Sequence, residues 1–104
     1  MGADERETVT AMMLSALGNE SRLRIYKLWV SAGLDGLNVS DIQERLKIPA
    51  STLSHHIATL RHAGLVIQRR EGRGILVSAD YETMINLITY LTEECCADVE
   101  GWGA

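Results

Sequence analysis

The most constraining feature of this chain is a proline that separates two short amphipathic segments. Ile48-Pro49-Ala50 ends the segment that begins at Ser40, because proline lacks an amide hydrogen and pushes the residue before it away from helical angles. Ser40 and Gln43 have the spacing of a capping box, so we expect Ser40 to cap the first helix. A second helix is predicted to begin within a residue or two of Pro49. The region therefore predicts two helices joined by a tight turn.

The second predicted helix has one apolar and one polar face. Leu53, Ile57 and Leu60 recur at i, i+4 and i+7, which is the spacing of a buried seam. The outward positions hold Ser51, Thr52, Ser54, His55 and Arg61. His56 has two open interpretations, a contact in a DNA groove or an inward structural histidine. Polar side chains at the start of a helix suit contact with phosphates and base edges in a major groove, which admits one helix.

A basic hairpin is predicted after this helix. Ala63-Gly64 ends the helix, and the pattern predicts a strand over 65–70, a glycine-bearing turn over 71–74 and a returning strand over 75–78. The arginines of the hairpin are Arg69, Arg70 and Arg73. We expect them to contact phosphates or the minor groove. Helix and hairpin together predict one cationic surface that binds duplex DNA.

Charge is segregated along the chain. The whole sequence has a formal net charge of -4, whereas nucleic-acid-binding proteins tend to be basic. Residues 51–74, however, carry four arginines against one glutamate, together with all three histidines, and residues 91–104 carry four acidic residues and no basic one. This is the distribution expected when one face of an acidic protein meets phosphate.

Length, composition and cysteine usage limit the class of protein. With 104 residues and 46% hydrophobic content, we expect a single domain over residues 1–104. No apolar run is long enough to span a membrane, and residues 4–7 are charged where a secretory leader needs its apolar core, so we expect the cytoplasm and no membrane partner. The adjacent Cys95 and Cys96 cannot build an extracellular disulfide framework. Without a readable nucleophile and base, phosphate loop or glycine fingerprint, we expect no enzyme.

Three further helices are predicted before and after the two helices and hairpin of residues 40–78. The first spans Val9 to Leu17, the second runs from the cap Asn19 to Gly33, and the third starts near Asp80 and continues to Cys95. Their apolar positions are Val9, Met12, Met13, Ala16 and Leu17, then Leu23, Ile25, Leu28 and Trp29, then Met84, Leu87, Ile88 and Leu91. Amphipathic helices at both chain ends favour a homodimer that reads two half-sites about 34–36 Å apart. An intramolecular core is the competing interpretation of these helices.

Four segments together resemble the ArsR/SmtB family of winged-helix repressors. The segments are Asn19–Ile25, Ser51–Ile57, His62–Val66 and Arg70–Arg73, and the likeness extends from about residue 9 to Cys96. The resemblance implies a mainly α fold, namely a winged helix-turn-helix of about five helices with a two-stranded wing. It implies a homodimer held by the first and last helices and operator double-stranded DNA as partner. It also implies that DNA is released when a metal or metalloid binds.

The sensing sites of that family can be compared with this sequence. One arsenic site has a Cys-x-Cys before the recognition helix, but residues 39–44 contain no thiol. The zinc site of the last helix would fall on Asp80, Glu82, Glu93 and Cys96. Both imidazoles of that pattern are missing, which suits zinc poorly. The pair Cys95-Cys96 resembles a third type, in which adjacent cysteines at the end of the last helix bind arsenite, although the third cysteine of that type is absent.

The cysteine pair is the predicted inducer site, since soft thiolates favour thiophilic ions. We predict that Cys95 and Cys96 bind trivalent arsenic or antimony species, either with an external third ligand or as a mono-organic arsenical whose carbon fills the third position. No constitutive cofactor is expected. A thiol redox switch is less favoured, because adjacent Cα atoms lie about 3.8 Å apart, closer than disulfides prefer. Sensing of a different metal, thiols that only fill space, and a dimerisation module without DNA binding are less favoured too.

Overall fold

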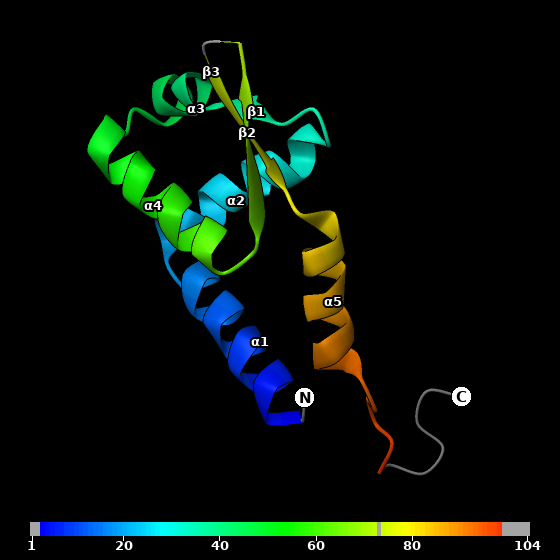
Figure 1. Ribbon diagram of the computed structural model, residues 1–104. Coiled ribbons are helices and arrows are strands. Elements are labelled where there is room, and N and C mark those ends of the chain that lie inside the picture. Colours follow the sequence, from blue (N-terminus) through cyan, green and yellow to red (C-terminus); the bar gives the residue numbers. More distant parts are fainter. Residues whose placement is uncertain (1–2, 73, 99–104) are drawn as a thin grey trace.

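The computed structural model describes residues 3–72 and 74–98, which form five helices and three strands. In chain order these are α1 (Ala3–Leu17), α2 (Glu20–Ala32), β1 (Leu37–Asn38), α3 (Val39–Leu46), α4 (Ala50–His62), β2 (Val66–Glu71), β3 (Gly74–Ala79) and α5 (Tyr81–Thr92). The sheet, α3 and α4 gather at one end, and α1 and α5 extend from the other (Figure 1). The predicted mainly α fold with a hairpin wing is confirmed.

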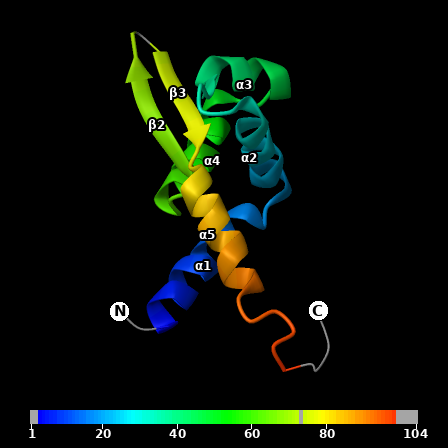
Figure 2. The same ribbon diagram turned by 90° about the vertical axis from the view of Figure 1, so that its right-hand side faces the viewer.

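The sheet contains one strand more than the sequence predicted. The two-residue β1 pairs antiparallel with β3, so the strand order is β1-β3-β2, and Leu37 lies opposite Val77. Gly36 allows this close approach, because it has a φ of 74° and a Cβ there would lie 2.5 Å from the carbonyl oxygen of Val77. Such a short strand leaves no alternating pattern in the sequence. The β2–β3 hairpin projects from the body as the wing (Figure 2).

The helix caps correct one prediction and confirm another. Asn38, not Ser40, caps α3: its Oδ1 accepts a hydrogen bond from the Ser40 amide at 2.9 Å and another from the Ser40 hydroxyl. The capping box predicted at Ser40 is therefore wrong, and α3 begins two residues earlier than a cap at Ser40 implies. The predicted cap at Asn19 is confirmed, since its Oδ1 accepts from the Arg22 amide at 3.1 Å.

The core lies between α2, α3, α4 and the sheet. Its largest fully buried side chains are Trp29, Ile25, Ile42, Leu53, Leu60, Leu65 and Val77. On α2, Ile25 and Trp29 are buried as predicted, but Leu23 is 46% exposed and Tyr26 takes its place in the core. Burial raises the pKa of the Tyr26 hydroxyl to about 12. The apolar side of α2 is thus rotated from the predicted one.

The two end helices contribute less to this core. Only Met13 and Ala16 of the α1 apolar positions, and Leu87 of α5, are buried. The helix α5 begins where predicted, after Asp80, but it ends at Thr92. The prediction that it continues to Cys95 is wrong, because Glu93 adopts an extended conformation with ψ of 134°. Within the described ranges, no helix is both long and apolar enough to cross a membrane.

Candidate nucleic-acid interface

The helix α4 has the two faces predicted for it. Leu53, Ile57 and Leu60 are buried at 0%, 5% and 0% exposure. The predicted outward residues Ser51, Thr52, Ser54, His55 and Arg61 are all exposed. The buried seam fixes the rotation of the helix, so the hydroxyls, the imidazole and the guanidinium are presented together to solvent. This is a face that can donate to phosphates and accept from or donate to base edges.

The start of α4 adds backbone donors to that face. Pro49 stands at the N-cap and no side chain caps the helix, whose first backbone bond runs from the Leu53 amide to the Pro49 carbonyl at 3.0 Å. The amides of the first turn, around Ser51 and Thr52, have no intrahelical acceptor. Amides at a helix start, together with the helix dipole, favour an anion such as a phosphate.

A side-chain hydrogen bond joins α4, the candidate recognition helix, to the wing. The Nη1 of Arg61 donates to the Oε1 of Gln68 on β2 at 3.1 Å. Beside this bond lies a groove of about 240 Å³, lined by Val39, Ser54, Ile57, Ala58, Arg61, Gln68 and Ile75. Helix and wing therefore share a continuous surface. Arg61, expected to contact DNA, lies at the joint between its two parts.

The wing arginines divide between the two faces of the hairpin. Side chains alternate along a strand, so Arg70 shares the face of Gln68, which is turned toward α4, and Arg69 lies on the other face. Both side chains are exposed. In the register of the hairpin, Arg70 pairs with Ile75, which also lines the groove beside α4. Arg73, the third predicted contact, lies outside the described residues.

His56 takes the inward of its two predicted orientations. It is 8% exposed, and its Nδ1 lies 3.5 Å from the Nη1 of Arg22. Burial lowers the pKa of His56, and the charges of Arg22 and His55 lower it further. A neutral ring can accept the Arg22 hydrogen bond. This placement makes His56 a contact between α4 and α2 and leaves His55 as the exposed imidazole of the adjacent pair.

Sequence reasoning missed Lys47 as a candidate contact. It is exposed, has a φ of 53° and forms the end of α3. With Ser40, Gln43 and Pro49 it lines a hollow beside the start of α4. A lysine at this turn can approach a backbone phosphate while α4 enters the groove. Its position directly before Ile48-Pro49 was the available signal.

Comparison with known proteins agrees with this geometry. Residues 17–69 match the family described as a helix-turn-helix domain. The transcriptional activator HlyU of Vibrio cholerae is 32% identical over 88 residues, which cover 82% of this chain and 79% of HlyU. The chain belongs to the ArsR family of winged-helix transcriptional regulators. This ArsR-family regulator is accordingly a DNA-binding protein and not an enzyme.

Solved structures support the same fold. The structure of HlyU from Vibrio cholerae has a TM-score of 0.67 at 30% identity, covering 88% of this chain and 97% of that one. An ArsR-like regulator from Rhodococcus sp. RHA1 has a TM-score of 0.74 at 22% identity, covering 90% and 85%, and so shows the fold alone. A putative arsenical resistance operon repressor of Halobacterium salinarum is 38% identical over 61 residues, 59% of this chain and 46% of that protein.

The cysteine pair of the ArsR-family regulator lies in a turn directly after α5. The Sγ atoms of Cys95 and Cys96 are 3.5 Å apart, a hydrogen-bond separation rather than a bond of about 2.05 Å. Cys95 is exposed and Cys96 half-buried. Two carboxylates at the positions of the family's zinc site lie in other contacts: Asp80 accepts from the Thr83 amide, and Glu93 pairs with Arg6. In the part of the chain that the structure describes, no three metal-ligating side chains converge.

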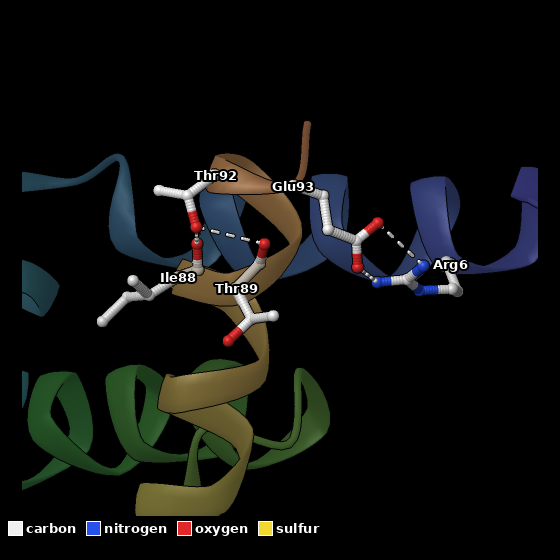
Figure 3. A network of polar contacts seen from close by, with 5 residues as sticks. All are labelled: Arg6, Ile88, Thr89, Thr92 and Glu93. Atoms are coloured by element: carbon white, nitrogen blue, oxygen red, sulfur yellow. Dashed lines mark hydrogen bonds and ion pairs between the residues drawn. The ribbon is translucent and has the colours of Figure 1, made fainter. Parts of the chain in front are cut away.

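An ion pair connects α1 to the end of α5, and a cavity lies between the two helices. The guanidinium of Arg6 donates to both carboxylate oxygens of Glu93, at 3.2 and 2.6 Å (Figure 3). The same guanidinium lies over the ring of Tyr90, 4.8 Å from its centroid. Each partner stabilises the charge of the other, which raises the pKa of Arg6 and lowers that of Glu93. Between the helices is a cavity of about 360 Å³, lined by Arg6, Val9, Thr10, Met13, Asn86, Leu87, Thr89 and Tyr90.

Proposed function

We propose that this ArsR-family regulator is a homodimeric repressor that releases operator DNA when a trivalent arsenic or antimony species binds Cys95 and Cys96. The observation that carries the inducer assignment is the 3.5 Å separation of the two Sγ atoms. Two sulfurs bonded at about 2.3 Å to one centre lie about 3.3–3.8 Å apart for bond angles of about 90–110°, which includes the pyramidal angle of trivalent arsenic. One thiophilic centre can therefore bind both sulfurs with little movement of the chain.

The shortage of a third ligand selects the kind of arsenical. Because the sequence contains only two cysteines, a third thiolate would have to come from outside the chain. A mono-organic trivalent arsenical already carries carbon at its third position, so two protein thiols complete it, each replacing one hydroxyl group of the arsenical, which leaves as water. Arsenite or antimonite needs an external ligand such as a small thiol. The likeness to a protein named as an arsenical resistance repressor points the same way.

The dimer is supported by the uncovered face of α5. Ile85, Ile88 and Leu91 are 56%, 53% and 57% exposed. Their positions place them on the side of α5 opposite Tyr90 and Asn86, which face α1. Val9, Met12 and Leu14 of α1 are about two-fifths exposed. Exposed apolar side chains on both end helices suit a two-fold interface.

The test is operator release measured with the thiols present and removed. The dimer, bound to a labelled fragment of the promoter beside its own gene, is titrated with arsenite and with methylarsenite. We expect release at lower methylarsenite than arsenite concentration, and no release for Cys95→Ser or Cys96→Ser. Ser15→Ala, on α1, is a control that leaves both thiols in place. Unchanged release in both cysteine variants would reject the site.

The thiol separation also suits a redox switch, which is the second candidate. Oxidation would remove two hydrogens from the thiols and transfer their electrons to an oxidant such as peroxide, leaving an S–S bond. Release by peroxide but not by arsenicals, reversed by a reducing agent, would favour it. A non-reducing gel then separates an inter-subunit bond, seen as a covalent dimer, from a bond between the adjacent cysteines.

A further inference from the structure

The first helix is fastened at its start to the end of α5. Arg6 forms a bidentate ion pair with Glu93, 87 positions further along the chain, and its guanidinium covers the Tyr90 ring. Figure 3 shows Glu93, directly after the end of α5, extending toward Arg6 on α1. Bidentate geometry holds the two side chains in one orientation. The pair and the ring together connect the beginning of α1 to the segment that carries the thiols.

The other end of α1 is fastened to the recognition helix. The Nε of Arg22 donates to the carbonyl of Ala16, in the last turn of α1, at 2.7 Å. The Nη1 of the same guanidinium lies 3.5 Å from the Nδ1 of His56 in α4. One half-buried arginine thus bridges α1 and α4. From Arg6 to Ala16 the helix spans about 15 Å at 1.5 Å per residue.

Backbone hydrogen bonds shape the turn that carries the thiols. The Cys95 amide donates to the Thr92 carbonyl and the Ala97 amide to the Glu94 carbonyl, both at 2.9 Å. Glu94 and Cys96 have φ values of 57° and 60°, a left-handed conformation that is uncommon for non-glycine residues. A centre bonded to both sulfurs closes a ring through the Cys95–Cys96 backbone. The ring and the Arg6–Glu93 pair therefore act on the same short segment.

The packing between α1 and α5 leaves room for adjustment. The cavity of about 360 Å³ lies between Val9, Thr10 and Met13 of α1 and Leu87 and Tyr90 of α5. An interior without such a space would resist a change in the angle between the helices. Here the relative position of α1 depends on Arg6 at one end and on the buried Met13 and Leu87 at the other.

We propose that α1 couples the thiol pair to the recognition helix, and that the Arg6–Glu93 ion pair is the contact that inducer binding breaks. This inference rests on the proposed function of Cys95 and Cys96. With the ion pair intact, α1 holds α4 through Arg22 and His56 in the arrangement that binds DNA. A bound arsenical fixes a different conformation of the turn, moves Glu93 away from Arg6 and releases that restraint. Arg6 and Glu93 are positioning residues and contact neither DNA nor inducer.

Thermodynamic linkage predicts how loss of the ion pair changes DNA binding and inducer binding. If the ion pair favours the DNA-binding state and the inducer disfavours it, then removing the ion pair weakens DNA binding and does not weaken inducer binding. Simple loss of folded protein would weaken both. The quantity that isolates coupling is the ratio of the DNA dissociation constants with and without inducer.

The experiment measures that ratio for Arg6→Gln and Glu93→Gln, with methylarsenite as probe. For the unaltered protein we expect a ratio of about 10 or more, within the usual range of coupling between two sites. Each variant should bind DNA about five-fold more weakly without methylarsenite, and its ratio should fall to about two or less. Methylarsenite affinity of the DNA-free variants should be equal or higher. Glu7→Gln and Glu82→Gln, which remove an exposed carboxylate from the same two helices, should keep the full ratio.

A charge-swapped protein, Arg6→Glu with Glu93→Arg, separates coupling from damage. It should recover most of the ratio, because the ion pair is restored in reverse. A full ratio in Arg6→Gln and Glu93→Gln would overturn the inference and leave the proposed function intact. A swapped protein as uncoupled as the single variants would overturn it too, since the two residues would then act separately. If methylarsenite does not change the DNA affinity of the unaltered protein, the proposed function is wrong, and the inference that rests on it is wrong too.

Discussion

The part of the molecule formed by α2, α3, α4 and the sheet, called the reading half below, buries most of its large apolar side chains within one chain. The two end helices, α1 and α5, do not. In the reading half, Ile42, Leu53, Leu60, Leu65 and Val77 are fully buried, and the exposed face is polar and cationic. In α5, three large aliphatic side chains are more than half exposed. The reading half is therefore specified by one chain. The end helices carry apolar surface that a second copy can cover.

The largest expected effect tests the first side of this contrast. Leu60→Ala removes a fully buried side chain of α4, and large-to-small core changes of this kind cost about 2–5 kcal/mol. Urea denaturation at a protein concentration that favours monomers measures it. Leu91→Ala on α5, where the side chain is 57% exposed, should lose less than about 0.5 kcal/mol under the same conditions. Equal losses would mean that both regions are packed alike.

The next effect tests the second side. Ile88→Asp places a charge on the uncovered face of α5, and burying that charge in an apolar interface is unfavourable. We expect the dimer dissociation constant to rise at least about ten-fold, which corresponds to about 1.4 kcal/mol. Sedimentation over a concentration series measures it. Asn86→Asp adds the same charge to the α1-facing side of the helix and should dimerise normally; if it dissociates equally, the interface is not the Ile85, Ile88 and Leu91 face.

The same contrast explains what the sequence predicted. In the reading half, a proline, a 3.6-residue repeat and a glycine turn act through near neighbours, so the bounds of α4 and of the wing strands were found to within a residue or two. The wrong predictions in the reading half also concern near neighbours in the sequence. Asn38, and not Ser40, caps α3, and the two-residue β1 is too short to give a pattern. Leu23 and Tyr26 exchanged roles because one turn of helix offers two nearly equivalent apolar sides.

At the chain ends the deciding contacts are remote in sequence. The apolar stripe of α5 was visible, but the helix ends at Thr92, and the next residue, Glu93, pairs with Arg6 of α1. No local pattern links residues 87 positions apart. Likewise, burial of His56 depends on Arg22, which lies on a different helix. The residue types at the candidate site could be predicted from the sequence, but the long-range hydrogen bonds and ion pairs between them could not.

A smaller effect is expected when arginines on the two faces of the wing are compared. Arg70 lies on the α4 side of the wing and Arg69 on the other side, so Arg70→Ala should weaken operator binding several-fold and make the slope of log K against log salt less negative by about 0.9. Arg69→Ala should change the slope less. Arg24→Ala, which removes an exposed arginine of α2, should leave it unchanged. Filter binding or fluorescence anisotropy between 50 and 200 mM salt, roughly the range over which phosphate contacts are resolved, measures the slopes. Equal slopes for Arg69→Ala and Arg70→Ala would mean that DNA covers both faces of the wing.

The smallest effect concerns the joint between α4 and the rest of the reading half. The pKa of His56 is lowered below its ordinary value of 6.5 by burial, then by Arg22 and His55. The folded state thus binds a proton less readily than the unfolded state. The stability that depends on neutral His56 is fully present above about pH 6.5 and is lost as the pH falls toward the folded-state pKa.

The slope of the unfolding free energy that one such proton contributes is at most about 1.4 kcal/mol per pH unit. Urea denaturation between about pH 7.5 and 5 should show this loss in the unaltered protein and a flatter profile for His56→Gln, whose amide can keep a hydrogen bond to Arg22 but does not titrate in this range. His55→Gln, which changes the exposed neighbouring imidazole, should retain most of the slope. If His55→Gln removes the slope and His56→Gln leaves it, the titrating group is on the DNA-facing side of α4, and the buried joint is insensitive to pH.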